Sequence, residues 1–469
     1  MKPTAIVVGG GLGGLATALT LSTHYDVKVF EKNSWLGGKM QSIQLGEHTF
    51  DFGPNTLTMP RYFWDVLAPF VQPKEALPFQ RVEQPTAHRF KDATITFTTD
   101  VAEMQRQIAL IDPVSAENYP AFILEITRLF HLSEKAFLNK TFFNVKDYTK
   151  ASLMKNLMAA RPFQTLDAFL GHYFPNKKIR QLFNRFATYI GSSPYETPAT
   201  FAMIAYFELV EGTYFLEGGP PNIAATFERV LREQGVKLHL NEPVLKFAMD
   251  GDTIRFCETE KGRYEADIFV SDMDYDVMQS LLGRKIPKRE LSTSAYVELI
   301  ALKEPVDLHH HNVLFSNDYV AEFKTLREGN YARKPSVYGC YPHASDSSRL
   351  PTLFVLINAP ANLYASQDGL VEQVDDALQK WGIKEEQIVE RKALPPHYIA
   401  DTFAVRQGAI YGQASNTWKG SFFRPSNHDL KLDNLYYVGG TVHPGGGSPI
   451  VVKGGYEVAK RIIQERQEV

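Results

Sequence analysis

The sequence predicts an α/β protein in which a parallel sheet with covering helices is combined with a β-rich part and a mostly helical part. Two observations carry this prediction. Residues 4–32 have the pattern of a strand, a glycine turn, a helix and a strand, and residues 435–464 form a second glycine-rich strand-to-helix segment. Because both segments place glycines where a strand turns into a helix, they indicate one ligand held by both ends of the chain.

The first segment, TAIVVGGGLGGLATALTLSTHYDVKVFEK, is typical of a phosphate-binding turn. Residues 5–8 are an apolar run suited to a buried parallel strand, and a helix is expected over residues 12–22. Gly9, Gly11 and Gly14 lie between and after them with G-x-G-x-x-G spacing. The first glycine allows the tight turn, the second lets the backbone approach a pyrophosphate, and the third lets the helix pack on the strand.

The second strand of this unit, residues 27–30, ends at Glu31, which lies 17 residues after Gly14. An acidic side chain at this place can accept hydrogen bonds from a ribose diol. The helix in between directs its N-terminal amides and its dipole at an anion. The alternative is a glycine turn without a ligand, and the complete strand–turn–helix–strand context favours a nucleotide.

Composition excludes several classes of protein. Of the 469 residues, 44% are hydrophobic and 22% charged, and the net charge of -3 offers no basic field for nucleic acid. Only Cys257 and Cys340 are present, so no disulfide framework is expected and a reducing compartment fits. No apolar run reaches 18 residues, so no transmembrane helix is expected. The apolar N-terminal run carries the glycine pattern, so we do not interpret it as a signal peptide.

Three further motifs extend the nucleotide site. The LGGK motif at 36–39 allows close backbone approach and places a cation near phosphates, and the DFGP motif at 51–54 is another tight turn. Near the C-terminus, a strand expected at 435–438 ends in a glycine loop that can press against a flat ring. Ser448 and Pro449 are a good N-cap and first residue for a helix that would stabilise negative charge on that ring.

Residues 101–209 are mostly helical in pattern, with helices expected at 117–137 and 163–173. The segments 140–146 and 150–163 mix cations with Phe, Leu and Met. Such a segment either lies in a lipid interface or buries its apolar face on the rest of the protein.

Residues 291–405 contain strands expected at 295–302, 336–341 and 353–359, with a helix at 370–381. We expect this sheet to form the floor of a substrate cavity. His309, His310 and His311 are adjacent, and adjacent histidines do not converge on one ion. With no cysteine or carboxylate at ligand spacing, the sequence predicts a solvated loop and no metal site here or elsewhere.

Together with the segments ADIFVSDMD (266–274), FFRP (422–425) and NLYYVGGTVHPGGGSP (434–449), these motifs resemble the flavin amine-oxidase superfamily and, within it, the bacterial phytoene desaturase family of carotenoid desaturases and oxidases. The resemblance implies an α/β fold with a Rossmann-like FAD-binding domain, a β-sheet substrate domain and a helical, membrane-associating domain. The implied divisions are 1–60, 210–290 and 405–469 for FAD binding, 61–100 and 291–404 for the substrate sheet, and 101–209 for the helical domain.

The resemblance also implies site residues. The implied cofactor contacts lie in the G-x-G-x-x-G unit, in the later turns and in the C-terminal glycine loop and helix start. They are Gly9, Gly11, Gly14, Glu31, Gly38, Lys39, Gly53, Pro54, Val244, Gly440, Thr441, Pro449 and Ile450. His443 is the candidate catalytic residue, because its position is near the flavin in the family. The residues show no Ser/His/Asp set and no nucleophilic cysteine context.

The activity implied is that of an FAD-dependent carotenoid desaturase, which oxidises a long polyene of the phytoene or dehydrosqualene type by hydride transfer to flavin. Such a substrate would leave a bilayer, so we expect a long apolar tunnel and peripheral attachment to the cytoplasmic face of the cell membrane. One alternative is a terminal-methyl oxidase of the same family, because Gly445-Gly446-Gly447 departs from the Gly-Ala-Gly usual in desaturases. The other is a non-catalytic prenyl-binding carrier of the GDP-dissociation-inhibitor type.

Overall fold

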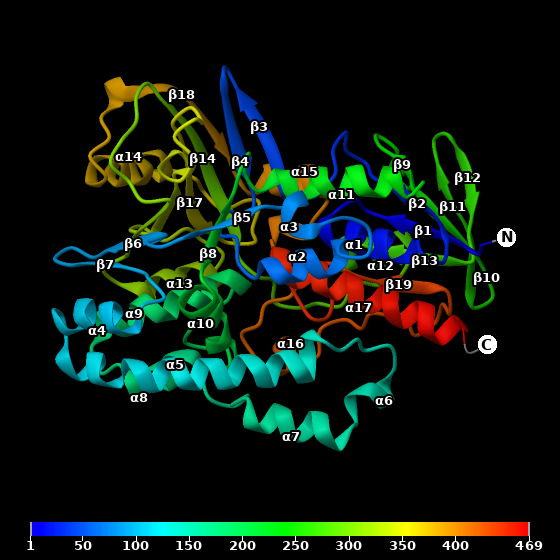
Figure 1. Ribbon diagram of the computed structural model, residues 1–469, viewed down its shortest axis with the longest axis horizontal. Helices are drawn as coiled ribbons and strands as arrows, with labels where there is room; N and C mark the ends of the chain where they lie inside the picture. The colour runs from blue at the N-terminus through cyan, green and yellow to red at the C-terminus, as the bar shows by residue number, and fades with distance from the viewer. Residues whose placement is uncertain (1, 468–469) are drawn as a thin grey trace.

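The structure is a computed structural model that describes residues 2–467. Its parts lie side by side in Figure 1, with a parallel sheet on the right, a larger mixed sheet at upper left and a group of helices at lower left. No helix among the described residues has the length and apolar character needed to cross a membrane.

The parallel sheet is built from strands at the beginning, middle and end of the chain. Its order is β19-β13-β1-β2-β9, and every neighbouring pair is parallel. The strands are β1 (Thr4–Val8), β2 (Asp26–Phe30), β9 (Lys237–His239), β13 (Ile268–Ser271) and β19 (Leu435–Tyr437). The helices α1 (Leu12–Leu21), α11 (Pro221–Glu233) and α17 (Ser448–Gln467) accompany it. The strand–turn–helix–strand prediction for residues 4–32 is confirmed.

Helices α1 and α17 pack closely because glycines face each other at their contact. A Cβ at Gly455 would collide with the carbonyl oxygen of Gly13. The Thr17 hydroxyl donates to the Gly13 carbonyl at 2.8 Å and lies 3.2 Å from the Gly455 carbonyl. Gly14 has the packing role that its spacing predicts, since a Cβ there would collide with the Gly9 carbonyl oxygen. The two ends of the chain therefore form one unit.

The mixed sheet has the order β18-β14-β17-β16-β15-β6-β7, in which only the β15–β6 pair is parallel. Its strands are β6 (Thr86–Arg89), β7 (Thr94–Thr96), β14 (Ser294–Leu302), β15 (His311–Leu314), β16 (Val337–Cys340), β17 (Thr352–Ala359) and β18 (Ile388–Leu394). Helix α14 (Leu370–Lys380) packs on one face through Val374, Ala377 and Leu378. The predicted strands and helix of this region are confirmed.

The prediction of a solvated loop at residues 309–311 is wrong. His311 begins β15, which lies between β16 and β6, and His310 and His311 are buried. Cys340 is the register partner of His311 on β16. Ligand atoms of His310, His311 and Cys340 lie within 4.8 Å of one another. The sequence argument against a metal ion, which assumed that no cysteine was near, therefore does not hold here.

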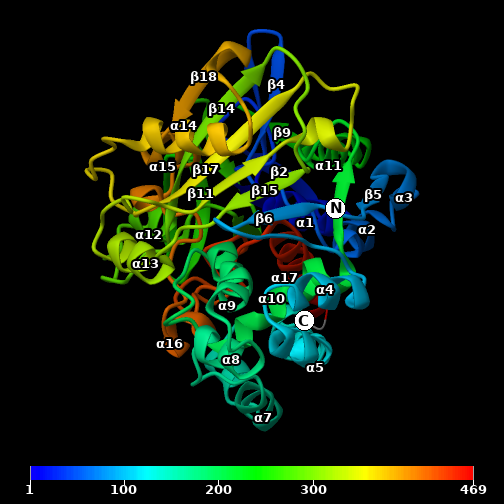
Figure 2. The ribbon, with the colours of Figure 1, turned by 90° about the vertical axis from the view of Figure 1, so that its left-hand side faces the viewer.

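The helical part surrounds a core rich in phenylalanine, including Phe122, Phe130 and Phe183. Its elements are α4 (Val101–Ala109), α5 (Pro113–Ser133), η1 (Glu134–Leu138), α6 (Val145–Tyr148), α7 (Ala151–Ala159), α8 (Leu166–Tyr173), α9 (Lys177–Asn184), η2 (Arg185–Ile190), η3 (Ala199–Met203), α10 (Ile204–Tyr206) and η4 (Phe207–Glu211). The helix expected from residue 163 begins at Leu166, because the Thr165 side chain caps it through the Ala168 amide. Helix α7 lies at the lower end of the molecule (Figure 2).

The remaining elements connect these parts. The strands form the β3 and β4 pair, the β5 and β8 pair and the β10-β11-β12 sheet: β3 (Gln41–Leu45), β4 (His48–Phe52), β5 (Phe79–Val82), β8 (Thr213–Leu216), β10 (Lys246–Asp250), β11 (Thr253–Thr259) and β12 (Gly262–Glu265). The helices and turns are α2 (Pro60–Leu67), α3 (Pro73–Ala76), α12 (Tyr275–Leu281), α13 (Tyr319–Arg327), η5 (Pro342–Ala344), η6 (Glu385–Gln387), α15 (Pro396–Phe403), η7 (Arg406–Gly408) and α16 (Trp418–Phe422). The domain boundaries given above stay predictions.

Candidate active site

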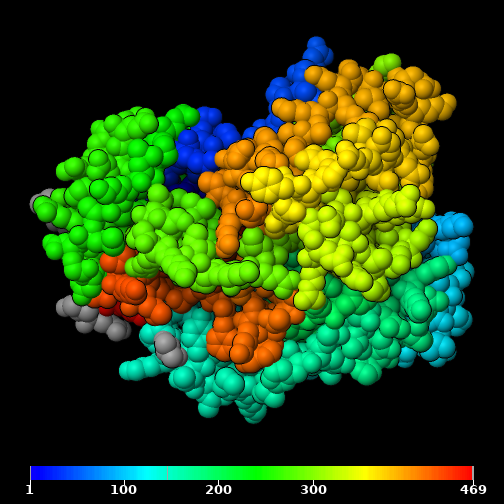
Figure 3. Space-filling model, turned by 180° about the vertical axis from the view of Figure 1, so that it is seen from behind, coloured from blue at the N-terminus to red at the C-terminus, as the bar shows by residue number. Residues whose placement is uncertain are grey.

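A cavity of about 500 Å³ lies at the carboxyl ends of the parallel strands. Its wall contains Gly9 after β1, Glu31 after β2, Asp272 after β13 and Gly439 after β19. Seen from behind, the surface is hollowed where blue N-terminal residues lie between green and orange segments (Figure 3). Ligands of parallel α/β sheets bind at this edge, so the position agrees with the predicted nucleotide site.

Most of the predicted cofactor contacts meet in this cavity. The wall includes Gly9, Gly11, Glu31, Gly38, Lys39, Gly53, Pro54, Val244, Gly440 and Thr441. Gly14 lies behind the turn and serves helix packing. Pro449 and Ile450 line a second cavity, which Gly53 and Pro54 also reach. Residues from both ends of the chain thus face one space, which suits an elongated dinucleotide with a planar ring.

The Glu31 carboxylate shapes the nucleotide turn. Its Oε2 accepts a hydrogen bond from the Gly10 amide at 2.8 Å, and its Oε1 accepts one from the Asn33 amide at 2.9 Å. The side chain is buried on the cavity wall. Each carboxylate oxygen can accept more than one hydrogen bond, so the geometry is compatible with contact to a ribose hydroxyl.

Lys39 and Asp272 both line the first cavity, and Asp272 lies directly against the glycine turn. Burial lowers the pKa of Lys39, although Asp274 and Asp272 favour its charged form. Burial raises the pKa of Asp272 to about 7, although the hydrogen bond from the Gly14 amide and the positive charge of Lys39 both lower it. Near neutral pH, Asp272 therefore titrates beside the place for a pyrophosphate. Asp272 is not among the predicted site residues, although its position directly after the buried strand β13 is a sequence signal for this edge of the sheet.

The second cavity, of about 260 Å³, lies between the mixed sheet and the helical part. It shares a wall with the first cavity, and this wall includes Gly53, Pro54, Tyr411, the glycine loop at 446–447 and residues of the mixed sheet such as Phe354. A reactive ring held in the first cavity would therefore meet a molecule held in the second. We interpret the second cavity as the substrate cavity.

The packing of the shared wall explains why the middle residue of Gly445-Gly446-Gly447 is glycine. A Cβ at Gly446 would overlap the ring of Tyr411. Arg424 supports the same wall, because its Nη2 donates to the Tyr411 carbonyl at 2.6 Å and to the Gly440 carbonyl at 3.1 Å. Burial lowers the pKa of Arg424 to about 10, with a further contribution from Arg289. Residue 446 must therefore lack a side chain because the Tyr411 ring occupies that space.

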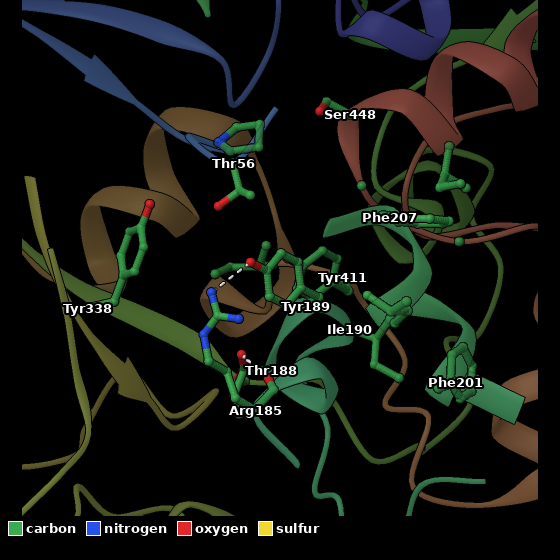
Figure 4. Close-up of a pocket in the computed structure, with 18 of the residues that line it drawn as sticks. Thr56, Arg185, Thr188, Tyr189, Ile190, Phe201, Phe207, Tyr338, Tyr411 and Ser448 are labelled. Carbon is green, nitrogen blue, oxygen red and sulfur yellow. Dashed lines mark hydrogen bonds between the residues drawn. The ribbon is translucent and has the colours of Figure 1, made fainter. Parts of the chain in front are cut away.

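The substrate cavity is less uniformly apolar than the predicted tunnel. Apolar side chains including Ile190, Phe201 and Phe207 line part of it. A cluster of polar side chains lines another part: Thr56, Arg185, Tyr189, Glu208 and Tyr338. Figure 4 shows all of them except Glu208 as labelled side chains around the same space.

None of these five residues, called the polar cluster from here on, is among the predicted site residues. The signal was a charge inside an apolar run, as in Phe183-Asn184-Arg185-Phe186 and Phe207-Glu208-Leu209. Pattern alone did not show that these two runs face each other.

His443, the predicted catalytic residue, lies elsewhere. Its side chain is buried, and Nε2 lies 3.1 Å from the Phe137 carbonyl and 3.0 Å from the Lys140 carbonyl. Burial lowers its pKa to about 4. Among the described residues that line the two cavities, the neighbouring Pro444 is present and His443 is not. The side chain fastens the C-terminal loop to residues 137–140, and its catalytic role stays a prediction.

Comparison with known proteins places these features in context. The sequence matches the family of flavin-containing amine oxidoreductases over residues 12–463. A 1-hydroxycarotenoid 3,4-desaturase of Flavobacterium sp. is 32% identical, with 95% of this chain and 96% of the relative covered. A zeta-carotene-forming phytoene desaturase of Myxococcus xanthus is 29% identical, with coverage of 98% and 93%. The fold resembles that of cyclohexylamine oxidase from Brevibacterium oxydans, with a TM-score of 0.64, 14% identity and 100% of both chains covered.

Proposed function

The chain belongs to the family of flavin-containing amine oxidoreductases, and we propose, from its similarity to carotenoid desaturases, that it desaturates a carotenoid polyene. Family membership confirms the predicted FAD-dependent oxidoreductase and its α/β fold. Relatives similar over nearly their whole length are named as carotenoid desaturases, which favours this reading over a prenyl-binding carrier. The observation that carries the proposal is the wall shared by a nucleotide cavity and a partly apolar second cavity.

The residues of the first cavity fit FAD. The turn from Gly9 to Gly11 would hold the pyrophosphate at the N-terminus of α1, with Lys39 supplying positive charge. Glu31 would accept from the ribose. The loop at 439–447 and Tyr411 would face the ring system. When bound, FAD supplies the acceptor for the two electrons that leave the substrate.

The protein's own contribution is to position the polyene and to exclude water. The apolar lining binds a hydrocarbon chain without directional bonds, so its shape sets the position of the chain against the shared wall. Side chains that line both cavities are placed to fix the distance between the polyene and the shared wall. They are Pro54, Ala295, Phe354, Leu356, Ile410, Tyr411 and Ser448. A C–H bond next to this wall is the bond that we expect to be oxidised.

The test is to feed polyenes to the expressed enzyme and to analyse the pigments. We expect purified protein to show flavin absorbance and the products to gain conjugated double bonds. An added aldehyde or hydroxyl would instead support the terminal-methyl oxidase. Protein that stays colourless after addition of FAD, or that converts none of the C30 and C40 polyenes offered, would contradict the proposal.

We also propose that the enzyme docks on the cytoplasmic face of the cell membrane through a surface on and after α7. Met154, Met158 and Phe163 are exposed there, and Lys155 lies beside Met154, whereas the nearby Arg161 pairs with Glu125. Phe163 also contacts Trp418, so the apolar surface continues onto α16. Exposed apolar side chains beside cations suit an anionic lipid interface. The position of α7 at one extremity of the molecule leaves this surface free to approach a bilayer (Figures 1 and 2).

A further inference from the structure

A buried group of nitrogen and sulfur ligands lies in the mixed sheet, and none of its members lines either large cavity. It consists of His310, His311 and Cys340, whose ligand atoms lie within 4.8 Å of one another. Cys340 is the register partner of His311, and the two histidine rings lie 4.5 Å apart between centroids at an angle of 70°. His310 precedes β15, so its side chain need not follow the alternation of the strand. Two adjacent histidines therefore do converge with the cysteine.

A hydroxyl group lies against one nitrogen of each histidine. His310 Nδ1 lies 2.7 Å from the Ser345 hydroxyl oxygen, and His311 Nδ1 lies 2.8 Å from the Tyr338 hydroxyl oxygen. This leaves Nε2 of each ring for another partner, and the buried Nε2 of His311 has none among the described residues. Histidines that bind a metal ion typically have this arrangement, because the second nitrogen donates to an oxygen that fixes the ring.

The protonation of the group suits a cation. Burial lowers the pKa of both histidines, that of His310 to about 4, so both rings are neutral near pH 7 and their nitrogens can bind an ion. Burial raises the pKa of the Cys340 thiol well above its usual range. The thiol therefore keeps its proton until a metal ion displaces it, which makes an ion and not an oxidant its expected reaction partner.

Two buried arginines near the histidines do not exclude a cation, because each has an anionic partner of its own. Arg349 pairs with Asp51 at 2.6 Å, and Arg185 pairs with Glu208 at 3.6 Å. Each pair is neutral as a whole, so the repulsion that a bound cation meets from either arginine is offset by the neighbouring carboxylate.

A small cavity beside the group offers a further coordination position. Its volume is about 10 Å³, which is room for about one water molecule, and His310 and Cys340 line it. Two imidazoles, a thiolate and a water are a ligand set typical of Zn²⁺. Ligand atoms of a tetrahedral zinc ion lie about 3.5 Å apart, so small side-chain shifts would bring the present atoms into range.

We propose that His310, His311 and Cys340 bind one zinc ion, which fastens β15 to β16. Because Tyr338 lies against His311 and lines the substrate cavity, the ion would also hold that part of the cavity wall in place. The zinc site does not depend on the proposed desaturase activity.

The experiment removes metal ions from the FAD-loaded enzyme with a chelator and titrates the enzyme with zinc chloride. We expect elemental analysis to give one tightly bound zinc ion per chain. The melting temperature should rise by a few degrees when free zinc exceeds its Kd about a hundredfold. Enzyme that retains its flavin and melts cooperatively but binds no zinc would overturn the inference. Binding of Cu⁺ without binding of Zn²⁺ would overturn the choice of metal.

Variants locate the bound ion. Cys340→Ser and His310→Gln each remove a ligand, and we expect Kd for zinc to increase at least about 100-fold. Ser345→Ala removes only the hydroxyl beside His310, on a half-buried loop residue, and should weaken binding about 10- to 100-fold. The matched control is Cys257→Ser, because Cys257 is equally buried but lies on β11, outside the histidine group.

Melting temperature and flavin content identify misfolded variants, and Ser345→Ala keeps the test open if a ligand variant does not fold. Zinc affinity unchanged in the well-folded variants, or lowered equally in Cys257→Ser, would show that the ion binds elsewhere and would overturn the site.

Discussion

The Glu31 carboxylate accepts a hydrogen bond from the Gly10 amide at 2.8 Å and so ties the end of β2 to the glycine turn after β1. Family members are expected to use the acid for the ribose, but in this chain it also fixes the turn that faces the pyrophosphate. Cofactor affinity and local order at the turn are therefore coupled through one side chain.

Glu31→Ala is expected to weaken FAD binding by about 1.5–3 kcal/mol, the usual range for hydrogen bonds to a charged group, which is roughly 10- to 150-fold in Kd. Titration of apoprotein with FAD, followed by flavin fluorescence, measures this. Glu31→Gln is the matched control, since its amide oxygen retains one acceptor, and it should lose less. An alanine variant with wild-type affinity would contradict the role of Glu31.

FAD affinity is expected to fall as pH rises through 7. Asp272 has a pKa of about 7 and lies beside the expected pyrophosphate site, so ionisation above that pH places a carboxylate near phosphate. If the neutral form binds, Kd increases up to about tenfold for each pH unit above 7. The Asp272→Asn variant should show a flat profile over the same range. Parallel pH profiles for the two proteins would refute this explanation.

The same group affects the stability of the protein without FAD. An aspartate has a pKa near 3.9 in an unfolded chain, so between about pH 4 and 7 the folded protein binds a proton that the unfolded chain releases. Stability must then decrease as pH rises through this window, by at most about 1.4 kcal/mol per unit. Denaturant unfolding of the apoprotein at several pH values, with Asp272→Asn as reference, measures the difference.

Gly446→Ala is expected to destabilise the wall between the two cavities, because the new methyl overlaps the Tyr411 ring. Overpacking of this kind costs about 1–3 kcal/mol, to be read as a lower melting temperature and reduced flavin content. Tyr411→Leu in the same chain should relieve the overlap, whereas Tyr411→Phe, which keeps the ring, should not. A Gly446→Ala protein with wild-type melting and flavin content would show that the ring moves freely.

Membrane docking is tested by co-sedimentation with vesicles. Met154→Ser with Met158→Ser should reduce binding to vesicles that contain anionic lipid, because burial of two exposed apolar side chains is lost. Val371→Ser is the control, since Val371 is also exposed but lies on α14, away from α7 (Figure 2). Equal loss in the control, or no loss in the α7 variant, would argue against this surface.

Short sequence motifs were sufficient to predict which residues line the nucleotide cavity. The turn after β1, the acid after β2 and the loop after β19 each depend on a few neighbouring residues, and their glycines have no tolerated substitute at close contacts such as Gly14. The sheet brings these segments together in parallel, so local motifs at distant positions converge without further information.

Contacts between residues far apart in the sequence determine the features that the sequence pattern did not predict. Three adjacent histidines suggested a solvated loop, but β15 is enclosed by β6 and β16, which buries His310 and His311. Arg185 and Glu208 are 23 positions apart on a short 3-10 helix, η2, and a short π-helix, η4, and their pairing depends on how these helices pack. Asp272 is adjacent to the glycine turn only because β13 pairs with β1.

The contact of Gly13 with Gly455 has a consequence for biosynthesis. Helix α1 is synthesised long before α17, and Gly455 of α17 packs on Gly13 of α1. The crevice that would hold the flavin nucleotide therefore cannot close until residues 448–467 have been translated. A chain that terminates before α17 would therefore lack one wall of this crevice and is expected to bind no FAD.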